Sequence, residues 1–210
     1  MSVTPALRTL VVYCHPNPES FNAAVFRTVC QALQGQPGVD TDVFKAFDLY
    51  AEGFDPVLSR EERAAYIDNP ALIESRVQKH VDAMRWAQHL VFVHPTWWYG
   101  PPALLKGWLE RVWLPGVAFK PPAKKGQITE PGLRHIERLS VITTGGAPWW
   151  WLKVIGDPHK KLFTKGLRVL MAKNCKTTWL QLHDMNVASA DERAAFLARV
   201  QKKLKTLKTL

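Results

Sequence analysis

Short apolar runs alternate along the chain with longer stretches that are apolar on one side and polar on the other. Most of the runs are compact and rich in β-branched residues, which is typical of strands buried on both faces. The predicted strands are residues 7–13, 39–47, 90–94, 139–143 and 176–182. Because helical patterns separate these runs, we expect one five-stranded parallel sheet with helices on both faces, an α/β architecture.

The stretches between the runs predict helices. They cover residues 22–33, 59–89, 101–112, 157–171 and 190–204. Ser59 stands three residues before Glu62, which is the spacing of a capping box, and Ser189 is expected to cap the last helix.

The remaining segments complete the predicted organisation. Residues 114–131 are rich in Pro, Gly and Lys and are predicted to form a long excursion. No linker, repeat or low-complexity tract interrupts the alternation. Residues 1–210 are therefore expected to form a single domain, with a basic tail at about 201–210.

Composition narrows the class of protein. An apolar share of 47% with 22% charged residues is that of a globular chain. The first residues lack the pattern of a secretory signal, and no apolar run is long enough to span a membrane, so we expect a cytoplasmic protein without a membrane span. Cys14, Cys30 and Cys175 are odd in number and widely spaced. Neither a disulfide framework nor a metal site is expected from them.

The formal net charge of +10 favours binding to an anionic partner. Nucleic acid, an anionic membrane surface and phosphorylated small molecules are the usual candidates. The lysines and arginines are scattered and no DNA-reading motif accompanies them, so nucleic acid is not expected. Attraction of a polyanionic cofactor or a nicotinamide dinucleotide is a sufficient use for the charge.

The predicted sheet also indicates where a ligand binds. Ligands of open α/β sheets bind beyond the carboxyl ends of the strands, where the strand order reverses. With the order 2-1-3-4-5, that edge carries the loops at residues 14–21, 95–100 and 144–152. All three loops have an unusual composition.

The first loop leads directly into a helix, so its amides and the helix N-terminus can bind an anion. Ser20 and Asn22 can add donors, and His15 could touch a phosphate. Neither GxGxxG nor GxxxxGK[ST] is present, which argues against a Rossmann dinucleotide site and a P-loop. The simpler interpretation is that Ser20 or Asn22 only caps the helix.

Aromatic residues fill the other two loops. Trp97, Trp98 and Tyr99 follow one strand, and residues 149–151 are three further tryptophans. Such residues at a binding edge favour walls for a planar ligand, although they could instead pack under the excursion or in a subunit interface. The glycines of residues 143–146 let the backbone approach a ligand closely, and their amides could face negative charge, or they could simply form a tight turn.

These segments together resemble the flavodoxin-like NAD(P)H:quinone oxidoreductases, the DT-diaphorase group and its bacterial relatives. Four motifs carry the resemblance, in order and over nearly the whole domain. They are H-P-x-x-x-S-F-N after the first strand, D-L-Y-A-E-G-F-D-P-V-L-S-R after the second, P-T-W-W-Y-G-P-P-A-L-L-K-G-W-L-E-R-V after the third and T-T-G-G after the fourth. The third motif is long enough to be highly specific.

The resemblance implies a flavodoxin-like fold and a homodimer with flavin at the subunit boundary. Hydride would pass from NAD(P)H through the flavin to a quinone-like acceptor, with ping-pong use of one pocket. Similarity to the longer quinone reductases favours FAD over the alternative, FMN. The implied cofactor-binding residues are His15, Ser20, Phe21 and Asn22 for the phosphates, Pro95, Thr96, Trp97, Trp98 and Tyr99 for the ribityl chain and ring, and Thr143, Thr144, Gly145 and Gly146 for the polar edge of the ring.

The chain departs from the family at one point. The best-known members carry a Tyr and a His after T-T-G-G, where this chain has Trp151 and Asp157, with His159 nearby but off register. Tryptophan can stack and donate one hydrogen bond, but it is no acid at pH 7. The candidate catalytic residues are therefore Trp151, Tyr99 and His159.

Two other functions fit parts of the sequence. Similar proteins act as flavin-binding ancillary subunits of potassium efflux systems, a regulatory role in which the basic surface would dock on a membrane protein. A one-electron flavodoxin carrier is disfavoured because flavodoxins are typically acidic.

Overall fold

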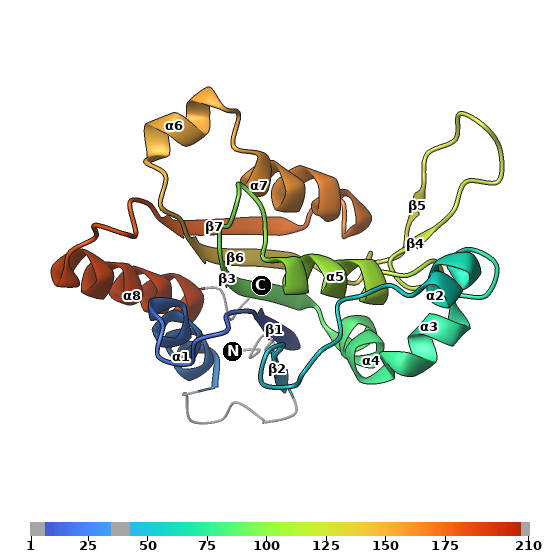
Figure 1. The fold of residues 1–210 in the computed structure, drawn as a ribbon, viewed down its shortest axis with the longest axis horizontal. Helices are drawn as coiled ribbons and strands as arrows, with labels where there is room; N and C mark the ends of the chain where they lie inside the picture. Colours follow the sequence, from blue (N-terminus) through green and yellow to red (C-terminus); the bar gives the residue numbers. More distant parts are fainter. Residues whose placement is uncertain (1–6, 35–42, 207–210) are drawn as a thin grey trace, which may run out of the picture.

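The computed structural model describes residues 7–34 and 43–206. Its centre is a five-stranded parallel sheet in the order β2-β1-β3-β6-β7 (Figure 1). The predicted order is thereby confirmed. The strands are β1 (Thr9–Tyr13), β2 (Phe44–Asp48), β3 (His89–Pro95), β6 (Arg138–Thr144) and β7 (Lys176–Leu182).

Helices cover both faces of this sheet, as predicted. On one face, α1 (Phe21–Gln34) packs beside α8 (Ala190–Lys205), and both contribute to a core with β1. On the other face lie α4 (Gln78–Trp86) and α5 (Ala103–Val112), whose Trp108 is fully buried. Every residue of β1, β3 and β6 is buried, which explains their continuous apolar runs.

The predicted helix over residues 59–89 is wrong as one element. It is divided into α2 (Arg60–Ala65), α3 (Ala71–Arg76) and α4. Pro70 lies between the first two, and a proline lacks the N–H that a helix interior needs. The capping box of Ser59 and Glu62 is confirmed, and so is the cap at Ser189.

Other elements also differ from the prediction. A helix over 157–171 is realised as α7 (Pro158–Lys161), a wide π-helical turn and a short 3₁₀ turn. The tryptophan-rich loop contains a short helix, α6 (Trp149–Val154). Two predicted segments lie partly outside the described residues. They are the strand predicted over 39–47, up to residue 42, and the tail beyond residue 206.

The excursion over 114–131 contains a small antiparallel hairpin that projects from the sheet (Figure 1). Its strands are β4 (Phe119–Lys120) and β5 (Glu130–Pro131). Among the helices of the described residues, none is long and apolar enough to cross a bilayer.

Candidate functional site

The carboxyl ends of β1, β3 and β6 meet at one edge of the sheet, and the three predicted loops lie together there. They enclose a cleft of about 620 Å³, within the range of about 300–1,000 Å³ found for small-molecule sites. All of the predicted cofactor-binding residues except Tyr99 and Thr143 line it. The lining residues are His15, Ser20, Phe21, Asn22, Pro95, Thr96, Trp97, Trp98, Thr144, Gly145, Gly146, Met185 and Asn186.

A second cavity of about 240 Å³ adjoins this cleft. The two share four lining residues, Thr96, Trp98, Gly145 and Gly146. The rest of the smaller cavity is lined by Tyr99, Ala147, Leu152 and Gln181. The cleft and the cavity therefore form one continuous candidate site.

The first loop is organised by its own side chains. The Nδ1 atom of His15 accepts a hydrogen bond from the Asn17 N–H at 3.0 Å, and Ser20 Oγ accepts from the Ala23 N–H at 3.1 Å. Ser20 thus caps α1 and lines the cleft at once, so the two interpretations of this serine are compatible. Burial lowers the pKa of His15, with an opposing contribution from the Asn17 carbonyl.

Asn22 ties the first loop to the loop after β6. Its Nδ2 donates to Thr144 Oγ1 at 2.9 Å. Its Oδ1 is buried and, within the part of the chain that the structure describes, has no hydrogen-bond partner. Buried polar atoms are seldom left unsatisfied, so this oxygen on the cleft wall points to a donor supplied by a ligand.

The aromatic loop is a tight turn with an uncommon backbone. The N–H and C=O groups of Trp97 and Gly100 bond each other reciprocally at 3.0 Å. Between them, Trp98 has φ 48° and Tyr99 has φ 59°. Non-glycine residues seldom adopt this left-handed conformation, and it costs of order 1–3 kcal/mol for each. Trp98 is also 97% exposed beside the cleft. Strain and exposure of this kind are typical of a ligand-binding turn.

The glycines after β6 pack closely against side chains of β7 and of the loop that follows it. A Cβ on Gly145 would lie 3.1 Å from Gln181 Nε2, and one on Gly146 would lie 2.9 Å from Asn186 Nδ2. The amide of Gly145 donates to Leu182 O at 2.9 Å, so it does not face the cleft. The expectation that successive amides of this loop face a ligand is therefore wrong for Gly145, because β7 uses that donor.

Two of the candidate catalytic residues are brought together. Trp151 Nε1 donates to Tyr99 OH at 3.1 Å, and both side chains are about two-fifths exposed. The third, His159, is buried behind Thr96 and lines neither cavity. Burial, followed by the neighbouring His94, lowers the pKa of His159 to about 2, so the ring is neutral. Asp157 caps α7 by accepting from Lys160 N–H.

Some residues of the site were not among the sequence candidates. They are Ala147, Leu152, Gln181, Met185 and Asn186. Met185 and Asn186 lie in the loop after β7, whose carboxyl end reaches the same edge of the sheet as those of the other strands. The strand order could have identified this loop, although its composition gives no signal.

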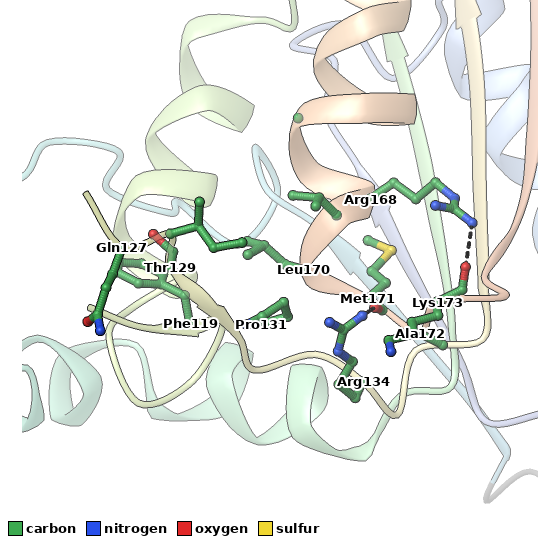
Figure 2. Close-up of a pocket in the computed structure, with 13 residues that line it drawn as sticks. Phe119, Gln127, Thr129, Pro131, Arg134, Arg168, Leu170, Met171, Ala172 and Lys173 are labelled. Atoms are coloured by element: carbon green, nitrogen blue, oxygen red, sulfur yellow. Dashed lines mark hydrogen bonds between the residues drawn. The ribbon is translucent and has the colours of Figure 1, made fainter. Parts of the chain in front are cut away.

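A separate groove of about 840 Å³ lies between the β4–β5 hairpin and residues 166–173 (Figure 2). Its lining includes Phe119, Ile128 and Val169, and it shares no residue with the cleft. Arg134 and Arg168 border it, and each donates to a main-chain carbonyl, of Met171 and Lys173 respectively. None of the predicted site residues lines this groove.

Comparison with known proteins assigns the family. Residues 7–206 match the family model described as a flavodoxin-like fold, and the chain belongs to this family. The resemblance noted from the motifs is confirmed.

The relatives include a ribosyldihydronicotinamide dehydrogenase [quinone] of Mus musculus, 27% identical over 95% of this chain and 91% of that protein. Another is the NAD(P)H dehydrogenase [quinone] 1 of Cavia porcellus, 33% identical over 67% of this chain and 54% of that protein. Among solved structures, Smu.1420 of Streptococcus mutans UA159 is similar with a TM-score of 0.77 and 30% identity, covering 94% of this chain and 98% of that one.

Proposed function

We propose that this protein is a flavin-dependent oxidoreductase that transfers hydride from NAD(P)H to a quinone or a similar electrophilic acceptor. The main support is the cleft in which three segments meet, namely the loop after β1, the strained aromatic turn after β3 and the T-T-G-G segment. The names of its relatives, which are quinone dehydrogenases, support the same reaction class. Donor and acceptor would use one pocket in turn, as in a ping-pong reaction.

The residues of the cleft fit a flavin. The volume of the cleft suits a small-molecule cofactor, and the unpartnered Oδ1 of Asn22 offers a buried hydrogen-bond acceptor. Ser20 and the N-terminus of α1 would bind the phosphate end, since helix N-termini attract anions. Trp98, which lines the cleft, would stack against the ring. A bound flavin would supply the hydride chemistry, while the protein supplies binding and orientation.

In this proposal the second cavity holds the reacting part of donor and acceptor. Thr96 and Gly146 line both spaces, so a substrate there would lie next to the bound ring. Tyr99 lines this cavity and accepts a hydrogen bond from Trp151, and it would orient the acceptor by stacking and by a hydrogen bond from its hydroxyl. His159 is neutral and buried, so we do not assign it proton transfer.

We further propose a homodimer in which the groove of Figure 2 contacts a second copy. Ile128 is 91% exposed and Val169 is 60% exposed, and both line this groove, so exposed aliphatic side chains gather there. Sedimentation equilibrium should give a dimer, and Val169→Asp should shift it toward monomer. Val187→Asp, an exposed valine outside the groove, is the matched control. A wild-type monomer would overturn this assignment.

The proposed cofactor is FAD, with FMN as the alternative, and the proposed location is the cytoplasm, where the three free cysteines would stay reduced. The decisive experiment is an absorbance spectrum of the purified protein, followed by mass analysis of the released flavin. We expect flavin absorbance that NADH or NADPH bleaches and a quinone restores. Colourless protein that also fails to bind added flavin would refute the proposed function.

A further inference from the structure

Thr96 occupies the junction of the candidate site. It lies at the carboxyl end of β3, lines both the cleft and the smaller cavity, and donates its N–H to Thr144 O at 2.6 Å. Its hydroxyl has two further neighbours. Thr143 Oγ1 is 3.0 Å away, and Nδ1 of His159 is 2.9 Å away. The direction in which the Thr96 O–H points therefore depends on which of these two neighbours donates a hydrogen bond to Thr96 Oγ1.

The surroundings of His159 decide which ring nitrogen carries the proton. The ring is 3% exposed and packs edge-on against Trp179 at 5.3 Å between centroids. Its Nε2 is buried and, among the described residues, has no hydrogen-bond partner. A proton on Nε2 would leave a buried N–H unpaired, whereas a proton on Nδ1 is donated to Thr96 Oγ1. The Nδ1–H tautomer is thus favoured.

This tautomer fixes the Thr96 hydroxyl. With His159 donating, one lone pair of Thr96 Oγ1 is occupied. The Thr143 hydroxyl has two acceptors in reach, Thr96 Oγ1 at 3.0 Å and Thr144 O at 3.4 Å, and when it donates to the nearer one it occupies the second lone pair. The Thr96 O–H is then left free to donate toward the cleft. Without the His159 bond, the threonine side chain loses the donor that holds its oxygen in place.

We propose that His159 is a positioning residue, which acts through Thr96 to direct the hydroxyl that this chain presents to an acceptor atom on the polar edge of the bound ring. The inference rests on the proposed flavin site. It gives His159 a role that touches neither substrate nor cofactor directly.

His94 provides an internal control for a purely packing role. Its ring lies 5.0 Å from that of His159, it is fully buried, and its Nδ1 donates to Pro95 O at 3.0 Å. It makes no hydrogen bond to Thr96. A change of either histidine to phenylalanine alters packing in the same cluster, but only one of the two changes removes a bond to Thr96.

The test compares flavin dissociation constants, by fluorescence titration, and flavin absorbance spectra for a set of variants. His159→Phe and Thr96→Val should each weaken flavin binding by about 3- to 10-fold, the value of one hydrogen bond. The double variant should bind as the Thr96→Val variant does. His159→Asn, whose amide can donate near the Nδ1 position, should restore most of the affinity and the wild-type spectrum. His94→Phe should bind flavin as the wild type does.

Two results would overturn this proposal and leave the proposed function standing. One is wild-type flavin affinity and spectrum in the His159→Phe variant, and the other is additivity of the two single changes. If His159→Phe does not fold, the proposal is overturned by wild-type affinity in Thr96→Val or by a His159→Asn variant that binds as weakly as Thr96→Val. Wild-type protein that binds no flavin would overturn the proposed function as well, so the two failures are distinguishable.

Discussion

Trp98 and Tyr99 adopt a backbone conformation that bulky residues seldom occupy. Glycine or asparagine is the ordinary choice where φ is positive at both central positions of a turn. Two aromatic residues there add strain and expose a large apolar side chain, with no gain to the core. A role for these side chains in binding a ring explains why they stand at such positions.

This role predicts a separation of binding from stability. Trp98→Ala should weaken flavin binding by about 1–3 kcal/mol through lost burial and stacking. Because the side chain is exposed, the free energy of unfolding of the flavin-free protein should change by less than about 0.5 kcal/mol. Flavin titration and urea denaturation measure the two quantities. Trp150→Ala, exposed but outside both cavities, should change neither. Equal flavin affinity in the Trp98→Ala variant and the wild type would contradict the assignment.

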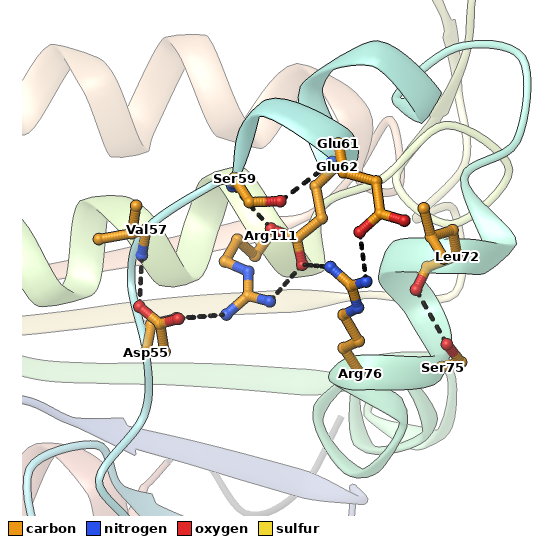
Figure 3. Close-up of polar contacts among 9 residues, drawn as sticks. All are labelled: Asp55, Val57, Ser59, Glu61, Glu62, Leu72, Ser75, Arg76 and Arg111. Atoms are coloured by element: carbon orange, nitrogen blue, oxygen red, sulfur yellow. Dashed lines mark hydrogen bonds and ion pairs between the residues drawn. The ribbon is translucent and has the colours of Figure 1, made fainter.

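At the scale of elements, a buried ionic cluster fastens the segment after β2 to α5 (Figure 3). Arg111 of α5 donates to Glu62 Oε1 at 2.5 Å and to Asp55 O at 2.6 Å. Arg76 also faces Glu62, at 3.4 Å. Burial acts to raise the pKa of Glu62, but the Ser59 N–H and the arginines outweigh it, so the pKa is lowered. The helix so fastened begins directly after the aromatic turn.

Glu62→Gln should therefore be costly. The change leaves Arg111 buried beside a neutral partner, and breaking a buried ion pair costs about 3–5 kcal/mol. Urea denaturation at neutral pH should show that loss. Glu61→Gln is the matched control, because its pair with Arg76 is exposed and contributes little to stability. Similar losses of the free energy of unfolding in the two variants would show that the ionic cluster does not hold α5 in place.

Local signals explain which elements were predictable. The capping boxes at Ser59 and Ser189 depend on residues three positions apart, so the sequence shows them directly. The π-helical turn after α7 depends on how Phe163 packs against β3 and β7, which no local pattern reports. The short helix at Trp149–Val154 was hidden by the expectation that a Gly- and Pro-flanked segment forms a loop.

At the scale of the whole molecule, the alternation of strands and helices predicted a parallel sheet, and the flavodoxin-like order assumed for its five strands is confirmed. That order located the cleft, because loops at one edge of a sheet are neighbours whatever their sequence separation. The hydrogen bonds inside the site were not predictable. The contacts of Thr96 with His159 and of Trp151 with Tyr99 join residues 63 and 52 positions apart. They depend on rotamers and burial that only packing decides.

Buried histidines make the whole fold sensitive to acid. Desolvation lowers the pKa of His89 to about 3, of His80 and His94 to about 4, and of His159 to about 2. In the unfolded chain a histidine titrates near about 6.5, so below that pH the unfolded state binds protons that the folded state does not. The free energy of unfolding must then fall as the pH falls, by up to about 1.4 kcal/mol per pH unit for each histidine.

Urea denaturation at stepwise pH between 7.5 and 5 should show this loss. Carboxylates such as Glu62, whose folded pKa is lowered, lose their contribution only below the unfolded value of about 4.3, so this window isolates the histidines. His94→Phe removes one such group, and its stability should fall less steeply with acid than that of the wild type, by up to one proton's worth. If the free energy of unfolding stays constant or rises as the pH falls through this window, the histidine rings take up protons without unfolding. His159 would then not be neutral, and the hydrogen bond that it donates to Thr96 would no longer follow from its tautomer.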